Sequence, residues 1–480
     1  MDDNATPHEI SIQPPTEAVG LDSAAADDAA LRQREADYEK FVWDNLPRNF
    51  AANFMHGMLG MTGFRMVLNT PTFIPVYLHV LAAGVMGMAP APLRMLVNPD
   101  FIVGLGLSLQ QVGQVVSPIV GATHIEHRKK VLPASILMGT LMRVQLLGMA
   151  VCGWFLSGAP LLLAMLVFLT LFGLFSGAQR VAFQLLLAKV IPISKRGQLQ
   201  GWRNLTGSLL AALLSWVAGT YLLGAHPLAP GAKVFGVQLF HNGYSTTFFL
   251  AFILTSAGLS VLQILLREPE PAKVRDKMKV SDRLKHLPEL LRSDRGFMFF
   301  MVAQICAMAS RIAAPFYILF ASRTVALTGE NIGLLTVAMT LGDALSNLLW
   351  GYLGDKSGFR STFVIALLLW ISSTILLMVT HNPAVVFVAF FGLGAGQSGY
   401  QMSSQTMVLE FGLREDMAMR LAFSGTAEGL MLTLGPLMGG VIAALAGYPS
   451  LFILSIVLEA VALVVLLTLV EEPRRRKVLV

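Results

Sequence analysis

The sequence predicts an all-α integral membrane protein with about twelve transmembrane helices, arranged as two pseudo-symmetric bundles of six. Hydrophobic residues make up 55% of the 480-residue chain and charged residues only 13%, where soluble domains carry about a quarter. The apolar residues gather in segments long enough to cross a bilayer. Motifs of the first six segments recur in the last six.

Each segment is expected to be a helix, because lipid offers no hydrogen-bonding partner and every backbone amide must pair within its own segment. In chain order, spans are predicted near residues 56–82, 103–122, 131–156, 160–188, 199–223, 245–266, 297–321, 331–353, 362–380, 384–409, 420–446 and 450–470.

The polar stretches between and beside these spans divide the chain. The start is acidic and rich in Ala and Pro, which is typical of disorder and unlike the basic start of a signal peptide. Aromatic residues among charges over 31–46 predict a short interfacial helix. The predicted organisation is a largely disordered tail with that helix at 1–50, a bundle at 51–266, a basic linker at 267–296, a bundle at 297–470 and a basic tail at 471–480.

Basic residues collect in alternate loops, which predicts that these loops face the cytoplasm. With an even number of spans, both termini then lie in the cytoplasm of a multi-pass plasma (inner) membrane protein. The net charge of +6 is accounted for by this orientation, so no nucleic acid partner is expected. Cys152 and Cys306 both fall within spans, so neither a disulfide framework nor a metal cluster is expected, and no cofactor is implied.

The loop Gly351–Arg360 turns the chain between two spans with glycines and charges. Gly351 is expected to let two helices approach closely, and Gly358 to permit a tight turn. Lys356 and Arg360 are expected to hold the loop on the cytoplasmic side.

This Gly-x-Leu-x-Asp-Lys-x-Gly-x-Arg pattern resembles the loop signature of the major facilitator superfamily. Three internal echoes favour a duplicated architecture: Phe172–Gly177 with Phe391–Gly396, Pro75–Leu78 with Pro315–Ile318, and Lys195–Gly197 with Arg414–Asp416. The resemblance implies a secondary transporter that works by alternating access. It also implies that Asp355 stabilises one gating state, with the start of helix 5 as its partner.

Charged and polar residues inside spans mark candidate sites, since they are costly in lipid and usually line a cavity. Two interpretations are open. In one, Arg65 and Arg311 clamp an anionic or carbonyl-rich substrate from the two halves; in the other, Asp343 neutralises Arg311 while Arg65 bonds backbone carbonyls. The candidates for substrate binding are Arg65, Asn69, Tyr77, Arg311, Tyr317, Gln397, Tyr400 and Gln401.

Proton coupling needs a titratable group in the membrane, and Asp343 and Glu428 are the candidates. Glu459 is expected to face a packing partner instead. The gating loop candidates are Gly351, Asp355, Gly358 and Arg360.

The predicted function is proton-coupled secondary transport of a small organic solute, with anions among the candidates, by a monomer in a lipid bilayer. The alternative is an exporter of hydrophobic or drug-like compounds. Gly435–Gly440 resembles an element that drug antiporters carry in their fifth helix. Here it lies in the eleventh predicted span, 420–446, and the fifth span lacks it, which argues against a drug antiporter. A sensor of transporter shape and a membrane enzyme are further alternatives; the histidines have no convincing catalytic partners, so the chain is not expected to be an enzyme.

Overall fold

The computed structural model describes residues 33, 35–68, 72–125, 130–223, 242–269, 294–411 and 417–471. The predicted disordered tail, Asn69 and nearly all of the basic linker lie outside the described residues. Within them the ordered elements are helices, and none is a strand. Each of the twelve predicted spans overlaps with helix in the described residues.

The first half contains α2 (Leu46–Val67), α3 (Ile74–Met88), η1 (Ala91–Leu93), α4 (Pro99–Ile125), α5 (Leu132–Phe155), α6 (Gly158–Val190), α7 (Ile193–Val217), its π-helical continuation η2 (Ala218–Leu222) and α8 (Gly243–Leu265). The second half contains α11 (Arg295–Ala309), η3 (Ser310–Phe316), α12 (Tyr317–Ala321), α13 (Gly329–Ser357), α14 (Phe359–Val379), α15 (Pro383–Glu410) and α16 (Met417–Thr468).

Side-chain caps explain where several helices begin. Asn242, Asp294, Thr328 and Asn382 precede α8, α11, α13 and α15, and each side chain accepts a hydrogen bond from a backbone N–H of the first turn. These N–H groups have no partner within the helix, so the caps stabilise its start.

The last two predicted spans form the single element α16, which changes direction at Gly447. This glycine has φ +77°, a left-handed conformation that side-chain-bearing residues rarely adopt. The chain therefore turns back into the bundle between residues 446 and 450, as the two predicted spans require.

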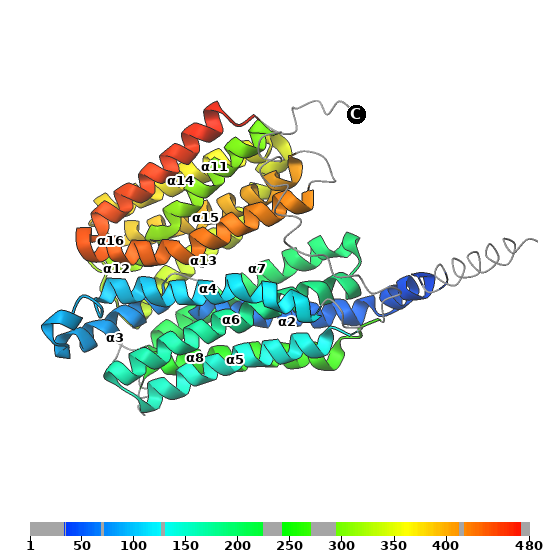
Figure 1. Ribbon diagram of the computed structural model, residues 1–480, viewed down its shortest axis with the longest axis horizontal. Helices are drawn as coiled ribbons and strands as arrows, with labels where there is room; N and C mark the ends of the chain where they lie inside the picture. Colours follow the sequence, from blue (N-terminus) through cyan, green and yellow to red (C-terminus); the bar gives the residue numbers. More distant parts are fainter. Residues whose placement is uncertain are drawn as a thin grey trace, which may run out of the picture.

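The helices form two bundles that lie side by side (Figure 1). In the first, α2 packs on α7 and α8, α4 on α6, and α5 on α6 and α8; in the second, α15 packs on α13 and α14, and α11 on α16. The bundles meet where α4 lies against α16 and α7 against α13. This is the fold class that the sequence predicts.

Eight of the described helices are long and apolar enough to cross a membrane. The long helices α2, α4 and α15 are not among them because they carry polar residues, such as Arg65, Gln110 and Gln397. These helices contain some of the candidate site residues, whereas Arg311 and Asp343 lie in segments that are apolar enough to cross a membrane.

Two spans are interrupted halfway. The first predicted span is divided between α2 and α3, and the seventh passes through the 3-10 segment η3. Pro315 lies inside η3; it has no N–H to donate, and its ring clashes with a carbonyl of the preceding turn. The related Pro75 lies in the first turn of α3. The paired motifs Pro75–Leu78 and Pro315–Ile318 thus mark structurally related breaks.

The signature loop turns the chain as expected at Gly358, whose φ is +87°. The expected close approach at Gly351 is not found: a Cβ there would meet no atom within 4 Å. It occurs at Gly354, where a Cβ would lie 2.4 Å from the Phe359 ring. Arg360 donates to the carbonyls of Leu466 and Leu467, at 2.9 and 3.0 Å, and so caps the end of α16.

Candidate functional site

A cavity lies between the two bundles at the depth of the helix breaks. It has a volume of about 660 Å³, including space open to solvent. Its walls combine apolar side chains with one cation and three amides. The lining residues are Leu68, Leu107, Gln110, Gln111, Arg311, Ala314, Pro315, Gln397, Met431, Leu432 and Pro436.

Arg311 is the charged residue of this cavity, and η3 carries it. Its guanidinium lies 3.9 Å from the Met308 sulfur, and among the described residues no carboxylate lies within ion-pair distance. Tyr400 and Glu428 are the groups that act on it electrostatically. Arg311 therefore has hydrogen-bonding capacity to offer a ligand.

Glu428 is held by side chains rather than by a direct ion pair. Gln304 donates to its Oε1 at 3.0 Å, and the Tyr400 hydroxyl lies 3.5 Å from the same oxygen. Gln304 also donates to Ser424 at 2.8 Å. This network links α11, α15 and α16 behind Arg311.

Arg65 and Asp343 form an ion pair between the two halves, with Nη1 of Arg65 donating to Oδ2 of Asp343. Asn347 supports Asp343, donating to its carbonyl at 2.7 Å, and Ser398 donates to the same carbonyl at 3.2 Å. The two charged side chains are 21% and 25% exposed. The alternative in which Asp343 neutralises Arg311 is therefore not found in this structure.

The remaining candidates divide between the cavity and the bundle interiors. Gln397 lines the cavity, and Gln401 is exposed one helical turn along the same face. Tyr77 is buried and stacks on Tyr244 with ring centres 4.5 Å apart. Tyr317 is buried with its hydroxyl 3.2 Å from Thr374. Neither tyrosine lines the cavity in this conformation.

Sequence reasoning missed Gln110 and Gln111, the two α4 residues that give this cavity most of its polarity in the first half. Their signal was present as adjacent amides within the predicted span 103–122. Pro436, part of the Gly435–Gly440 element, also lines the cavity.

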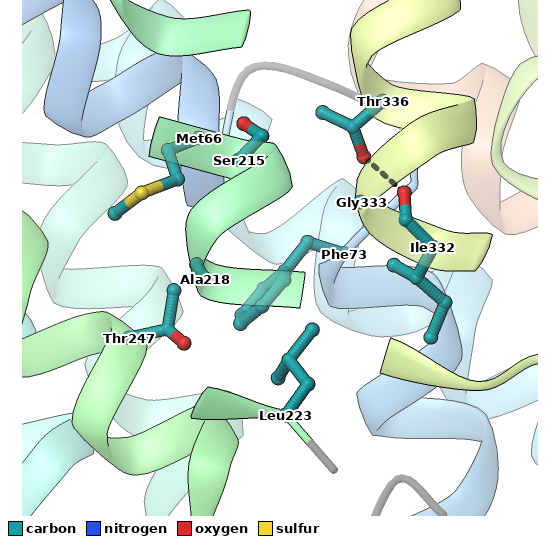
Figure 2. Close-up of a pocket in the computed structure, with 9 residues that line it drawn as sticks. All are labelled: Met66, Phe73, Ser215, Ala218, Leu223, Thr247, Ile332, Gly333 and Thr336. Carbon is teal, nitrogen blue, oxygen red and sulfur yellow. Dashed lines mark hydrogen bonds between the residues drawn. The ribbon is translucent and has the colours of Figure 1, made fainter. Parts of the chain in front are cut away.

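A second, smaller pocket of about 200 Å³ lies where α2, η2 and α13 meet, with mostly apolar walls (Figure 2). The Thr336 hydroxyl turns back to the Ile332 carbonyl, at 2.7 Å (Figure 2), and lies 2.7 Å from the hydroxyl of Thr72. Its lining contains no charged residue. This pocket belongs to the contact between the halves.

The close contacts between the halves gather at one end of the helices. We call this the opposite end, because it lies away from the basic-loop end that carries Arg48, Arg196 and Arg360. At the opposite end, a Cβ on Gly219 would lie 2.4 Å from the Gly329 carbonyl. There too the Tyr448 hydroxyl donates to Asp100 at 2.7 Å.

Comparisons with known proteins agree with this geometry. A family model described as Major Facilitator Superfamily matches residues 299–479. The protein named "Multidrug resistance protein MdtG" of Salmonella paratyphi C (strain RKS4594) is 26% identical over 414 residues, covering 85% of this chain and 93% of the relative. The protein of the same name from Salmonella typhi is also 26% identical over 414 residues.

Solved structures show the same fold at low identity. A D-xylose-proton symporter has a TM-score of 0.64 at 13% identity, covering 89% of this chain and 99% of the other. A mutant form of the nucleoside transporter NupG has a TM-score of 0.61 at 12% identity, covering 87% and 99%. Two bundles of membrane helices, the signature loop and a polar cavity between the halves agree with these similarities: the second half of the chain matches the Major Facilitator Superfamily model, and the chain as a whole is similar to multi-pass membrane transporters.

Proposed function

We propose that this transporter moves a small organic solute with an anionic or carbonyl-rich group, and that transport is coupled to protons. The observation that carries the proposal is Arg311, a cation in the cavity between the halves without an ion-pair partner among the described residues. A guanidinium binds a carboxylate or phosphate through two parallel hydrogen bonds.

The cavity lining defines the rest of the ligand. Gln110 and Gln397 can donate to and accept from polar substituents, while Leu68, Leu107 and Leu432 favour an apolar body. An amphipathic organic anion therefore fits this site better than a free inorganic ion.

Proton coupling is assigned to Asp343. Its ion pair with Arg65 joins the two halves, and protonation of the carboxylate would remove the charge that holds them together. An alternating-access cycle needs such a contact, one that is stable in one state and is released in another.

The proposed orientation places both termini and the basic-loop end in the cytoplasm of the plasma (inner) membrane. The close contacts at the opposite end then separate the cavity from the outside. On this proposal the described conformation faces the cytoplasm, and the protein works as a monomer without a nucleic acid partner.

Export of hydrophobic or drug-like compounds is the second candidate. It is favoured by the apolar part of the lining, including Met431 and Pro436. The curated relatives carry the name multidrug resistance protein. For such a ligand, Arg311 would contribute little to affinity.

The test is a thermal-shift screen followed by flux in proteoliposomes, with benzoate and tetraphenylphosphonium as probes of opposite charge. If the proposal holds, benzoate raises the melting temperature, and both Arg311→Lys and Arg311→Gln lower its affinity by about tenfold or more, or about 1.4 kcal/mol. Arg323→Lys is the matched control, because Arg323 is exposed at the opposite end. Binding of tetraphenylphosphonium that is insensitive to Arg311 would favour the second candidate.

A further inference from the structure

Glu459 is a fully buried acid outside the cavity. It lies in the second part of α16, with 0% of its surface exposed. Its carboxyl group lies beside the side chains of Ser310 and Ser455. Ser310 is the first residue of η3 and directly precedes Arg311. A carboxyl group thus packs against the break that carries the proposed substrate-binding cation.

The hydrogen atoms of both serines are already committed. The Ser455 hydroxyl donates to the Ser310 carbonyl at 2.8 Å, and the Ser310 hydroxyl donates to the Ala307 carbonyl at 2.8 Å. A hydroxyl has only one hydrogen to donate, so in this arrangement neither serine donates to Glu459. Neither carboxyl oxygen of Glu459 has a hydrogen-bond partner among the described residues.

The neighbouring aromatic residues supply no donor either. Tyr317 is the titratable group that faces Glu459 from α12. The Thr374 hydroxyl donates to the Trp370 carbonyl, and the Trp370 indole donates to the Tyr317 oxygen. The hydrogen bond between the Tyr317 and Thr374 hydroxyls is therefore donated by Tyr317, so its hydrogen does not go to Glu459.

No described cation lies within ion-pair distance of Glu459. An ionised carboxylate only accepts hydrogen bonds, and it would be unpaired and dehydrated here. A protonated carboxyl group can instead donate its O–H to a serine oxygen. The surroundings of Glu459 therefore favour the neutral acid.

We propose that neutral Glu459 is a positioning residue that holds η3, and with it Arg311, in the shape that faces the cavity. Pro315 interrupts the backbone hydrogen bonding of this span, so Ser310 and its contacts with α16 fix the segment. Ionisation of Glu459 places an unpaired charge against η3 and loosens it. The consequence for ligand affinity rests on the proposed function of Arg311; the control of η3 does not.

The experiment reports on η3 without a substrate. Ala314 lies on η3 and lines the cavity. The Ala314→Cys variant, combined with Cys152→Ser and Cys306→Ser, is labelled with a neutral maleimide from about pH 6 to about pH 9. The same background carrying Glu459→Gln is labelled in parallel, so that ionisation of the introduced thiol cancels in the ratio of the two rates.

The proposal expects labelling of the parent to rise with pH relative to the Glu459→Gln variant, by up to about tenfold per pH unit once Glu459 loses its proton. In the Glu459→Leu variant, which has no hydrogen-bond donor at position 459, the thiol at position 314 should be labelled fast at every pH. In the Glu459→Gln variant, which keeps a donor, labelling should be slow. Parallel pH profiles for the parent and the Gln variant would overturn the proposal, as would Gln and Leu variants that label alike.

Protection of the thiol at position 314 by benzoate separates this proposal from the proposed function. If Glu459 controls labelling but Arg311→Gln leaves benzoate protection unchanged, Arg311 is not the anion-binding group and the control of η3 still stands. If Arg311→Gln abolishes benzoate protection but Glu459→Gln leaves the pH profile of labelling unchanged, Arg311 is the anion-binding group and Glu459 does not control η3.

Discussion

Arg65 and Asp343 show how the placement of single charges joins the two halves. Between residues 51 and 266 the acidic residues are Asp100 and Glu126, and neither lies near the middle of a span. Arg65 lies in the last turn of α2, where a cation also interacts favourably with the helix dipole. A carboxylate to balance it at mid-membrane depth has to come from the second half, and Asp343 provides it.

A double-mutant cycle on Arg65 and Asp343 tests this pair. Because both side chains are partly exposed, we expect Arg65→Ala to lower the unfolding free energy by about 1–3 kcal/mol, between the values for surface and buried pairs. Asp343→Asn should recover much of that loss in the double variant. Thermal unfolding in detergent micelles provides the measurement.

The matched cycle uses Arg311 and Asp343, which are not paired in the structure, and should show coupling below about 0.5 kcal/mol. Equal coupling in the two cycles would contradict the assigned pairing.

At the scale of single elements, glycines decide how closely helices of different halves approach. A Cβ on Gly333 of α13 would lie 2.8 Å from the Ser215 carbonyl and 3.2 Å from the Gly219 Cα. All three nearest atoms belong to α7 and η2, in the other half. Backbone atoms cannot give way as a flexible side chain can, so this contact requires a residue without a side chain.

Gly333→Leu should therefore separate α13 from α7 and favour a conformation open at the opposite end. Gly351→Leu is the control on the same helix, because a Cβ there meets no atom within 4 Å. The measurement is maleimide labelling of a cysteine introduced in place of Thr336, with Cys152 and Cys306 replaced by Ser. We expect labelling to increase by about tenfold or more for Gly333→Leu, a shift of about 1.4 kcal/mol. Equal labelling of the two leucine variants would refute the role of this contact.

At the scale of the whole molecule, the opposite end is held by a polar contact beside an aromatic cluster. Tyr448 donates to Asp100 at 2.7 Å, and His79 lies 3.6 Å from the same carboxylate oxygen. The Tyr448 ring also contacts Phe316 and Phe452, with centroids 6.2 and 6.5 Å apart. α4 of the first half is thereby joined to α16 of the second.

Tyr448→Phe keeps the ring contacts and removes the hydrogen bond to a charged acceptor, an interaction typically worth about 1.5–3 kcal/mol. We expect the equilibrium to shift by about tenfold or more toward opening at the opposite end, measured with the same thiol label as for Gly333→Leu. Tyr352→Phe is the control, since Tyr352 is exposed near the basic-loop end. Unchanged labelling in both variants would remove Tyr448 from the closure of this end.

The sequence by itself determined the properties that depend on local chemistry. Span positions follow from the need to bury apolar segments in lipid, and the turn at Gly358 from its tolerance of positive φ. Pro315 explains the break at η3, but that span was expected to be one helix. The related halves were also visible, because paired motifs recur along the chain.

Only the tertiary structure decided which polar residues meet. Arg65 and Asp343 are 278 positions apart, and no local pattern determines their pairing. Tyr77 and Tyr317 point into their own bundles, while Gln110 lies at the cavity. The physical reason is that a helix in a bundle has two faces shielded from lipid, one toward its own bundle and one toward the cavity. Both accept polar side chains, so a polar stripe predicts only that a face avoids lipid, and the packing of the other helices decides whether it meets a partner or a substrate.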